Sequence, residues 1–154
     1  YYAGFTYWKQ PALTITWFSP QSGLFIYTPV VLLSLVFAVI MIVRKEFNGV
    51  LVIFTFLLTS HMCASWYNPF FGECNFGKRP MIEYFPVIML PMAFMAQWFS
   101  AYPKITRNVL LIATLFFVYY NQALFGAFNT CFGGEAWEWS KFGKLLFRAL
   151  TIIR

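Results

Sequence analysis

The sequence predicts an all-α protein that crosses a membrane several times, and three observations predict it. The 154 residues are 60% hydrophobic and only 10% charged, whereas a soluble domain carries about 25% charged residues to wet its surface. Four apolar runs reach the length of about 20 residues that a helix needs to cross a bilayer. The runs are uniformly apolar, unlike barrel strands, which alternate lipid-facing and lumen-facing side chains. This composition excludes an ordinary cytosolic enzyme, a disordered chain and a fibrous one.

The four runs are the expected spanning helices of a single transmembrane domain. Proline lacks an N–H, so we expect kinks at Pro29 in the first run and at Pro86 and Pro91 in the third. No internal repeat or soluble second domain is evident. The helices are expected near residues 24–43, 49–66, 81–101 and 108–128.

Basic residues in the short loops predict the orientation of these helices. The turns at 44–46 and 104–107 each carry two basic residues, and cytoplasmic loops are enriched in lysine and arginine. We therefore expect both turns on the cytoplasmic side, and the loop 67–80 with both chain ends outside. Lys78 and Arg79 in that outer loop run against the rule, which indicates either the opposite topology or a functional site.

The tail at residues 135–154 predicts an amphipathic helix lying at the membrane interface. Lys141, Lys144 and Arg148 recur at spacings of three and four with apolar residues between them. We interpret the net charge of +6 as favouring contact with anionic lipid head groups rather than with nucleic acid.

Because the first residue is Tyr1 and no signal peptide precedes the first run, we expect a fragment of a longer chain.

The cysteines and the single histidine predict no metal or haem site. Cys63 lies inside an apolar run and is expected to be a small buried hydrophobe. Cys74 and Cys131 fall in loops on the same expected side, so a disulfide between them stays open. His61 lies within the second run, where an ionisable residue is a functional candidate. Haem held by two histidines needs a second one, so a structural role for His61 is favoured.

The loop before the third run carries the candidate site. Glu73, Lys78, Arg79 and Glu83 lie within eleven positions. If a helix starts at Pro80, Arg79 and Glu83 lie four apart and can pair at its outer end. An arginine beside a helix N-terminus at head-group level would bind phosphate, because the guanidinium gives bidentate donors and the free N–H groups add positive potential. Alternatively, the pair only pins the loop while Lys78 extends to water.

No catalytic motif accompanies this loop. The chain contains no Asp, no glycine-rich phosphate loop, no HExxH motif and no Ser/His/Asp set. Glu73 and Glu83 are the only carboxylates of the central outer loop, which leaves little acid–base machinery. These residues alone do not make a complete enzyme, and no cofactor is evident from them.

Two segments carry motifs that are more specific as a pair than singly. The first, at residues 19–29, is Ser-Pro-Gln-Ser-Gly-Leu-Phe-Ile-Tyr-Thr-Pro, and the second is Trp66 followed by Phe-Gly-Lys-Arg at 76–79, Glu83 and Pro86. In this order they resemble the C-terminal part of bacterial integral-membrane glycosyltransferases of the GT-C class, relatives of the dolichyl-phosphate-mannose protein mannosyltransferases. The chain departs from that pattern only in the loop, where Gly-Glu-Cys-Asn precedes Phe76 in place of Gly-Gly or Gly-Gly-Ser.

The resemblance implies transfer of a sugar from a polyprenyl-phosphate carrier to an acceptor at the outer face of the bacterial inner membrane. In that family the general base is a carboxylate of the first outer loop, which would lie upstream of the present residues. The resemblance further implies that Arg79, with Lys78, stabilises the phosphate leaving group while Glu83 orients Arg79. Some members of the family use a divalent metal, although no metal cluster is visible in this sequence. Further candidates for the same site are Glu73, Trp66 and His61.

Two other function classes stay open. A flippase or transporter fragment for the same anionic lipid would bind it through Arg79 without chemistry. A small structural subunit of a larger membrane complex would pack its aromatic helices against partner helices or lipid. A carboxylate in an upstream outer loop favours the transferase, whereas inverted halves with broken helices favour the transporter.

Overall fold

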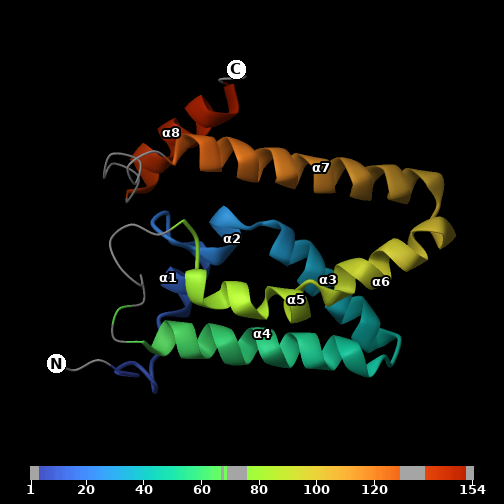
Figure 1. The fold of residues 1–154 in the computed structure, drawn as a ribbon, viewed down its shortest axis with the longest axis horizontal. Coiled ribbons are helices and arrows are strands. Elements are labelled where there is room, and N and C mark those ends of the chain that lie inside the picture. Colours follow the sequence, from blue (N-terminus) through green and yellow to red (C-terminus); the bar gives the residue numbers. More distant parts are fainter. Residues whose placement is uncertain (1–3, 67, 69–75, 129–137, 152–154) are drawn as a thin grey trace.

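The computed structural model describes residues 4–66, 68, 76–128 and 138–151, which form helices and no strands (Figure 1). The all-α prediction is therefore confirmed for this part of the chain. In order, the elements are α1 (Leu13–Phe18), α2 (Leu24–Tyr27), α3 (Val30–Val43), α4 (Phe47–Ser65), the 3₁₀ helix η1 (Arg79–Tyr84), α5 (Phe85–Ile88), α6 (Leu90–Trp98), the 3₁₀ helix η2 (Phe99–Ala101), α7 (Lys104–Ala127) and α8 (Trp139–Thr151).

Two of the described helices are long and apolar enough to cross a membrane. They are α4, with 19 residues, and α7, with 24 residues. At the rise of an α-helix these lengths correspond to about 28 and 36 Å, against a hydrocarbon core of about 30 Å. The runs expected at 49–66 and 108–128 thus form single helices with slightly earlier starts.

The run expected as one helix at 24–43 is instead broken between α2 and α3. Proline disfavours the helical conformation of the residue before it, and Thr28, which precedes Pro29, has φ −137° and ψ 65°. At the break, the carbonyl of Tyr27 accepts a hydrogen bond from the Nδ2 group of Asn121 on α7. The interruption therefore ties α7 to the first part of the chain.

The run expected as one helix at 81–101 is also interrupted, and forms η1, α5, α6 and η2. Pro80, Pro86 and Pro91 stand in the first turns of η1, α5 and α6, where each removes a backbone donor that a longer helix needs. The Ile88 carbonyl, at the end of α5, accepts a hydrogen bond from the hydroxyl of Ser34 on α3. Side chains of neighbouring helices thus satisfy carbonyls that both breaks release.

The two basic turns lie at the same end of the molecule. Figure 1 shows the α3–α4 and α6–α7 turns at one end, and the N-terminal segment, the end of α4 and the start of α8 at the other. The Arg44 guanidinium lies 4.2 Å from the ring centroid of Trp98, which links the α3–α4 turn to the end of α6. The two turns thus lie on one side of the molecule, and the assignment of that side to the cytoplasm stays a prediction.

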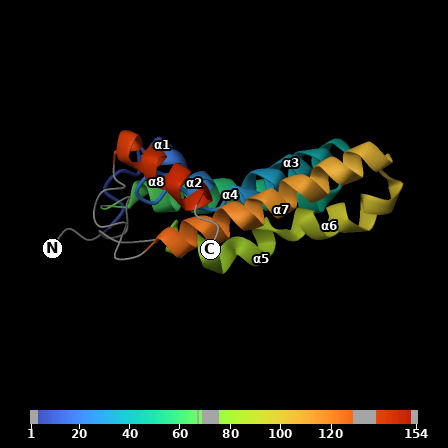
Figure 2. The same ribbon diagram turned by 90° about the horizontal axis from the view of Figure 1, so that it is seen from above.

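The helix α7 lies over the layer formed by α3 and α6 and is largely exposed (Figure 2). Of its described side chains only Leu124 is buried. The predicted amphipathic tail helix is present as α8, whose Phe142, Leu145 and Leu146 pack in a cluster with Leu124 and Tyr27. The apolar face of α8 therefore contacts α2 and α7, while its basic side chains are exposed.

Candidate functional site

Residues 19–29 form a tight corner in which packing explains the residue types. A Cβ added to Gly23 would lie 2.5 Å from the backbone nitrogen of Ser19, so only glycine fits there. The hydroxyl of Tyr27 donates a 2.7 Å hydrogen bond to the Pro20 carbonyl. These contacts hold the ring of Tyr27, the last residue of α2, in a fully buried position.

The Phe-Gly-Lys-Arg segment packs directly against this corner. The ring of Phe76 meets the ring of Tyr27 edge-on, with centroids 5.1 Å apart. Gly77 has φ 70°, a left-handed conformation that glycine adopts without strain, and a Cβ there would lie 3.3 Å from the Cβ of Tyr27. After this turn Lys78 is only 3% exposed, whereas Arg79 is exposed. The alternative in which Lys78 extends to water is therefore wrong.

Lys78 lines a cavity of about 340 Å³ between α7, η1 and the α2–α3 break, which we call the lysine cavity. Its polar lining includes Thr28 at the break and Asn121 and Gln122 on α7. The remaining lining is apolar or aromatic apart from Gly77: Pro29, Val30, Phe76, Ile82, Phe85, Phe117 and Val118. An ammonium group thus shares an otherwise mainly apolar cavity with a few hydrogen-bonding side chains.

The surroundings of Lys78 make this group an anion-binding candidate. Burial lowers the pKa of Lys78 to about 8, and the nearby Cys63 sulfur on α4 opposes part of that lowering. At neutral pH the ammonium form still predominates. A charge in such surroundings is poorly screened by water, so it attracts an anion more strongly than a surface lysine does.

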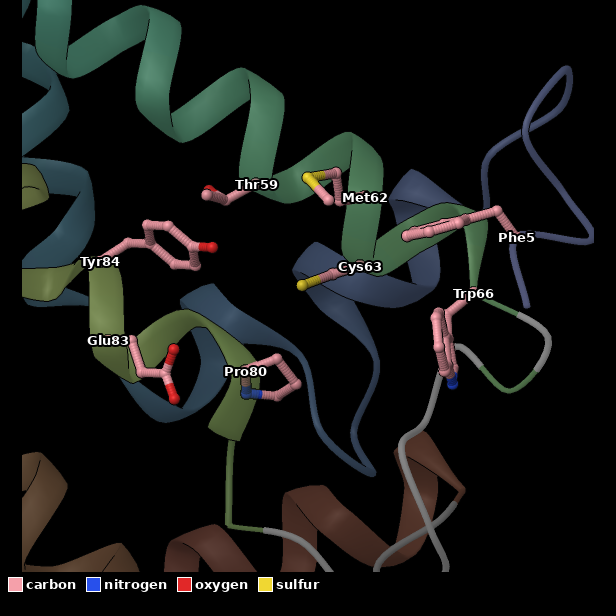
Figure 3. A pocket seen from close by; sticks show the side chains of 8 residues that line it. All are labelled: Phe5, Thr59, Met62, Cys63, Trp66, Pro80, Glu83 and Tyr84. Atoms are coloured by element: carbon pink, nitrogen blue, oxygen red, sulfur yellow. The ribbon is translucent and has the colours of Figure 1, made fainter. Parts of the chain in front are cut away.

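A second cavity, of about 250 Å³, lies on another face of η1, and we call it the glutamate cavity (Figure 3). The 3₁₀ helix contributes Glu83 and Tyr84, and Figure 3 shows the Tyr84 hydroxyl directed into the space beside Thr59 and Cys63. The rings of Phe5 and Trp66 stand on the far side, edge-on to each other with centroids 5.2 Å apart. Pro80 and Met62 complete the lining.

Arg79 and Glu83 do not form the expected pair, because their segment is a 3₁₀ helix and not an α-helix. In a 3₁₀ helix the side chains at i and i+3 are eclipsed, while those four apart point in different directions. Arg79 therefore shares a face with Ile82, which lines the lysine cavity, and Glu83 shares one with Pro80, which lines the glutamate cavity. Within the described part of the chain no ion pair joins Arg79 to Glu83.

The other candidates divide between the two cavities and their surroundings. Trp66 lines the glutamate cavity, whereas His61 is partly buried against Trp8, with ring centroids 4.7 Å apart. Cys63 is buried and free, as predicted. Among the residues that the structure describes, no group of three His, Cys, Asp or Glu could hold a metal ion. Glu73 and the pair Cys74 and Cys131 lie outside the described residues.

Sequence reasoning missed the contributions of Thr28, Tyr84, Asn121 and Gln122. A signal existed for the last two, because adjacent amides near the end of an otherwise apolar run require polar partners. Tyr84 carried no such signal, because interfacial tyrosines are common in membrane proteins.

Comparisons with protein-family models, with curated proteins and with solved structures find no match to this chain. Its function must therefore be inferred from the two cavities and the residues that line them.

Proposed function

We propose that this chain is the carrier-binding part of a membrane glycosyltransferase, which transfers a sugar from a polyprenyl-phosphate carrier to an acceptor. In this proposal the chain is the C-terminal portion of a multi-pass protein of the bacterial inner membrane. The broken segments α2–α3 and η1–η2 cross the membrane together with α4 and α7. The observation that carries the proposal is the burial of Lys78 in a cavity between apolar helices.

The lysine cavity suits the phosphate of such a carrier. Lys78 supplies a positive charge, and the Thr28 hydroxyl and the Gln122 amide line the same space as hydrogen-bond donors. Arg79 lies on the face of η1 that carries Ile82 and adds a second positive charge near the cavity. Together they offer the charge-assisted hydrogen bonds that bind phosphate oxygens strongly.

The exposed surface of α7 suits the polyprenyl tail of the carrier. Its large apolar side chains include Ile112 and Leu115, which are 63% and 60% exposed. A chain lying along this helix replaces bilayer lipid without exposing apolar surface to water. The phosphate would then lie near Gln122, toward the end of α7 from which the chain continues to α8.

The chemical contribution of these residues is stabilisation of the leaving group. During transfer the bond between the sugar C1 and the phosphate oxygen breaks, while the acceptor oxygen bonds to C1 and gives its proton to a base. The departing phosphate gains negative charge, which the protonated Lys78 and Arg79 stabilise. We expect the base to be a carboxylate in an upstream outer loop.

The direct test compares carrier binding by two lysine variants. Lys78→Met is expected to weaken binding of undecaprenyl phosphate to the purified full-length protein in lipid nanodiscs at least about tenfold, the loss of one charge-assisted contact. Lys144→Met is the matched control, because Lys144 is exposed on α8. Replacing a buried charge by an apolar side chain of similar size often preserves stability, and thermal unfolding checks this. Unchanged binding by Lys78→Met would exclude the phosphate site.

A second measurement separates transfer from transport. The natural protein in its own membrane is supplied with a radiolabelled sugar on undecaprenyl phosphate. The proposal expects the label to reach an acceptor, and expects Lys78→Met to abolish that transfer. Movement of intact carrier across the bilayer without transfer of the sugar would contradict the transferase and support a flippase.

A further inference from the structure

We infer that the glutamate cavity, lined by Glu83, Tyr84 and Trp66, is a subsite for the sugar of the carrier. This inference rests on the proposed function, since it assigns a place to the group that the carrier delivers. It also gives Glu83 a role different from orienting Arg79, which lies on another face of η1.

The lining of this cavity has the chemistry that a sugar ring requires. Ligand sites combine apolar walls with a few polar groups that converge on the ligand. Trp66 and Phe5 present aromatic surface, against which the C–H face of a sugar can pack. From the facing wall, the Glu83 carboxylate accepts hydrogen bonds from sugar hydroxyls, and the Tyr84 hydroxyl both donates and accepts them (Figure 3).

The position of the cavity relative to Lys78 supports the assignment. The 3₁₀ helix η1 is the shared wall, with Pro80 and Glu83 lining the glutamate cavity and Ile82 the lysine cavity. Lys78 directly precedes η1 in the chain and lines the lysine cavity, whereas Cys63 on α4 lines the glutamate cavity. We therefore place the phosphate at Lys78 on one side of η1 and the attached sugar on the other side.

The charge of the cavity predicts which sugars it takes. Glu83 is its only described acidic lining residue, and no described basic residue lines the cavity. A carboxylate repels a second carboxylate in a shared, partly apolar space. The subsite should therefore accept neutral or amino-substituted sugars and disfavour uronic acids.

The test measures binding of glycosylated and bare carriers to the same variants in nanodiscs. The probes are undecaprenyl phosphate alone and its diesters with glucose, mannose and glucuronic acid. Glu83→Gln and Tyr84→Phe are expected to weaken binding of the preferred neutral sugar diester about tenfold each. Their affinity for bare undecaprenyl phosphate should stay within about twofold. Glu83→Gln should also improve binding of the glucuronic acid diester relative to the neutral ones.

The controls separate this inference from the proposed function. Glu138→Gln is the matched control, because Glu138 is exposed and its Oε2 lies 3.8 Å from the Nζ of Lys141. This substitution should change none of these affinities. Lys78→Met should weaken binding of bare and glycosylated carriers alike. If Glu83→Gln weakens both kinds of carrier equally, or neither, the sugar subsite is refuted while the phosphate site at Lys78 can still stand.

Discussion

Binding of a sugar-linked carrier is expected to weaken as the pH rises from 7 to 9. Burial lowers the pKa of Lys78 to about 8, so about nine-tenths of this group is protonated at pH 7 and about one-tenth at pH 9. Only the protonated form attracts phosphate, and the phosphodiester keeps a single negative charge over this range. The affinity should therefore fall about tenfold across the two pH units, as the charged fraction does.

The assay for this prediction is titration of nanodiscs in zwitterionic lipid at pH 7, 8 and 9 and constant ionic strength. Lys78→Arg is the matched control, because a guanidinium stays charged throughout the range, and its affinity should be independent of pH. Cys63→Ser removes the neighbouring thiol that opposes part of this lowering, so the affinity should still fall as the pH rises but should begin to fall at a lower pH. A flat wild-type profile, or the same slope in Lys78→Arg, would refute the role of Lys78.

Two further substitutions test the geometry that buries this lysine, each by thermal unfolding in detergent. Gly77→Ala should destabilise the protein by about 1–2 kcal/mol, because alanine is strained in the left-handed conformation. Gly126→Ala, where an added Cβ meets nothing within 4 Å, should not destabilise it, so equal losses would contradict this reasoning. Asn121→Leu removes the hydrogen bond to the Tyr27 carbonyl and should cost about 1–3 kcal/mol. Gln122→Leu should cost less, and the reverse order would argue against the tie between α7 and the α2–α3 break.

Hydrophobic patterning predicts the helical class and the long helices α4 and α7, because their runs contain no proline to interrupt them. It does not predict that prolines divide the runs at 24–43 and 81–101 into separate short helices. Pro29 and Pro86 indicate kinks, but whether the chain resumes as the same helix depends on partners for the released carbonyls. Ser34 and Asn121 provide those partners from other helices, and such tertiary contacts are invisible in a local pattern.

The candidate site was predictable as a region but not as a geometry. The charged loop and Trp66 point to residues that do line cavities, namely Lys78 and Glu83. The choice between α-helix and 3₁₀ helix after Lys78 determines whether Arg79 meets Glu83, and spacing alone does not settle it. Burial of Lys78 depends on the left-handed turn at Gly77, which packs against Tyr27. These two residues lie 50 positions apart in the sequence, so a local pattern does not reveal their contact.

The most direct test of the central claim is to locate the bound phosphate by photocrosslinking. Undecaprenyl phosphate carrying a diazirine close to the phosphate is bound in nanodiscs, irradiated, and the labelled peptides are identified by mass spectrometry. A phosphate at Lys78 predicts labels at the lining residues of the lysine cavity in two segments, 76–78 with Ile82 and Phe85, and 117–118 with 121–122. These labels should be lost in Lys78→Met. Labels confined to α8, or unchanged in Lys78→Met, would contradict the account.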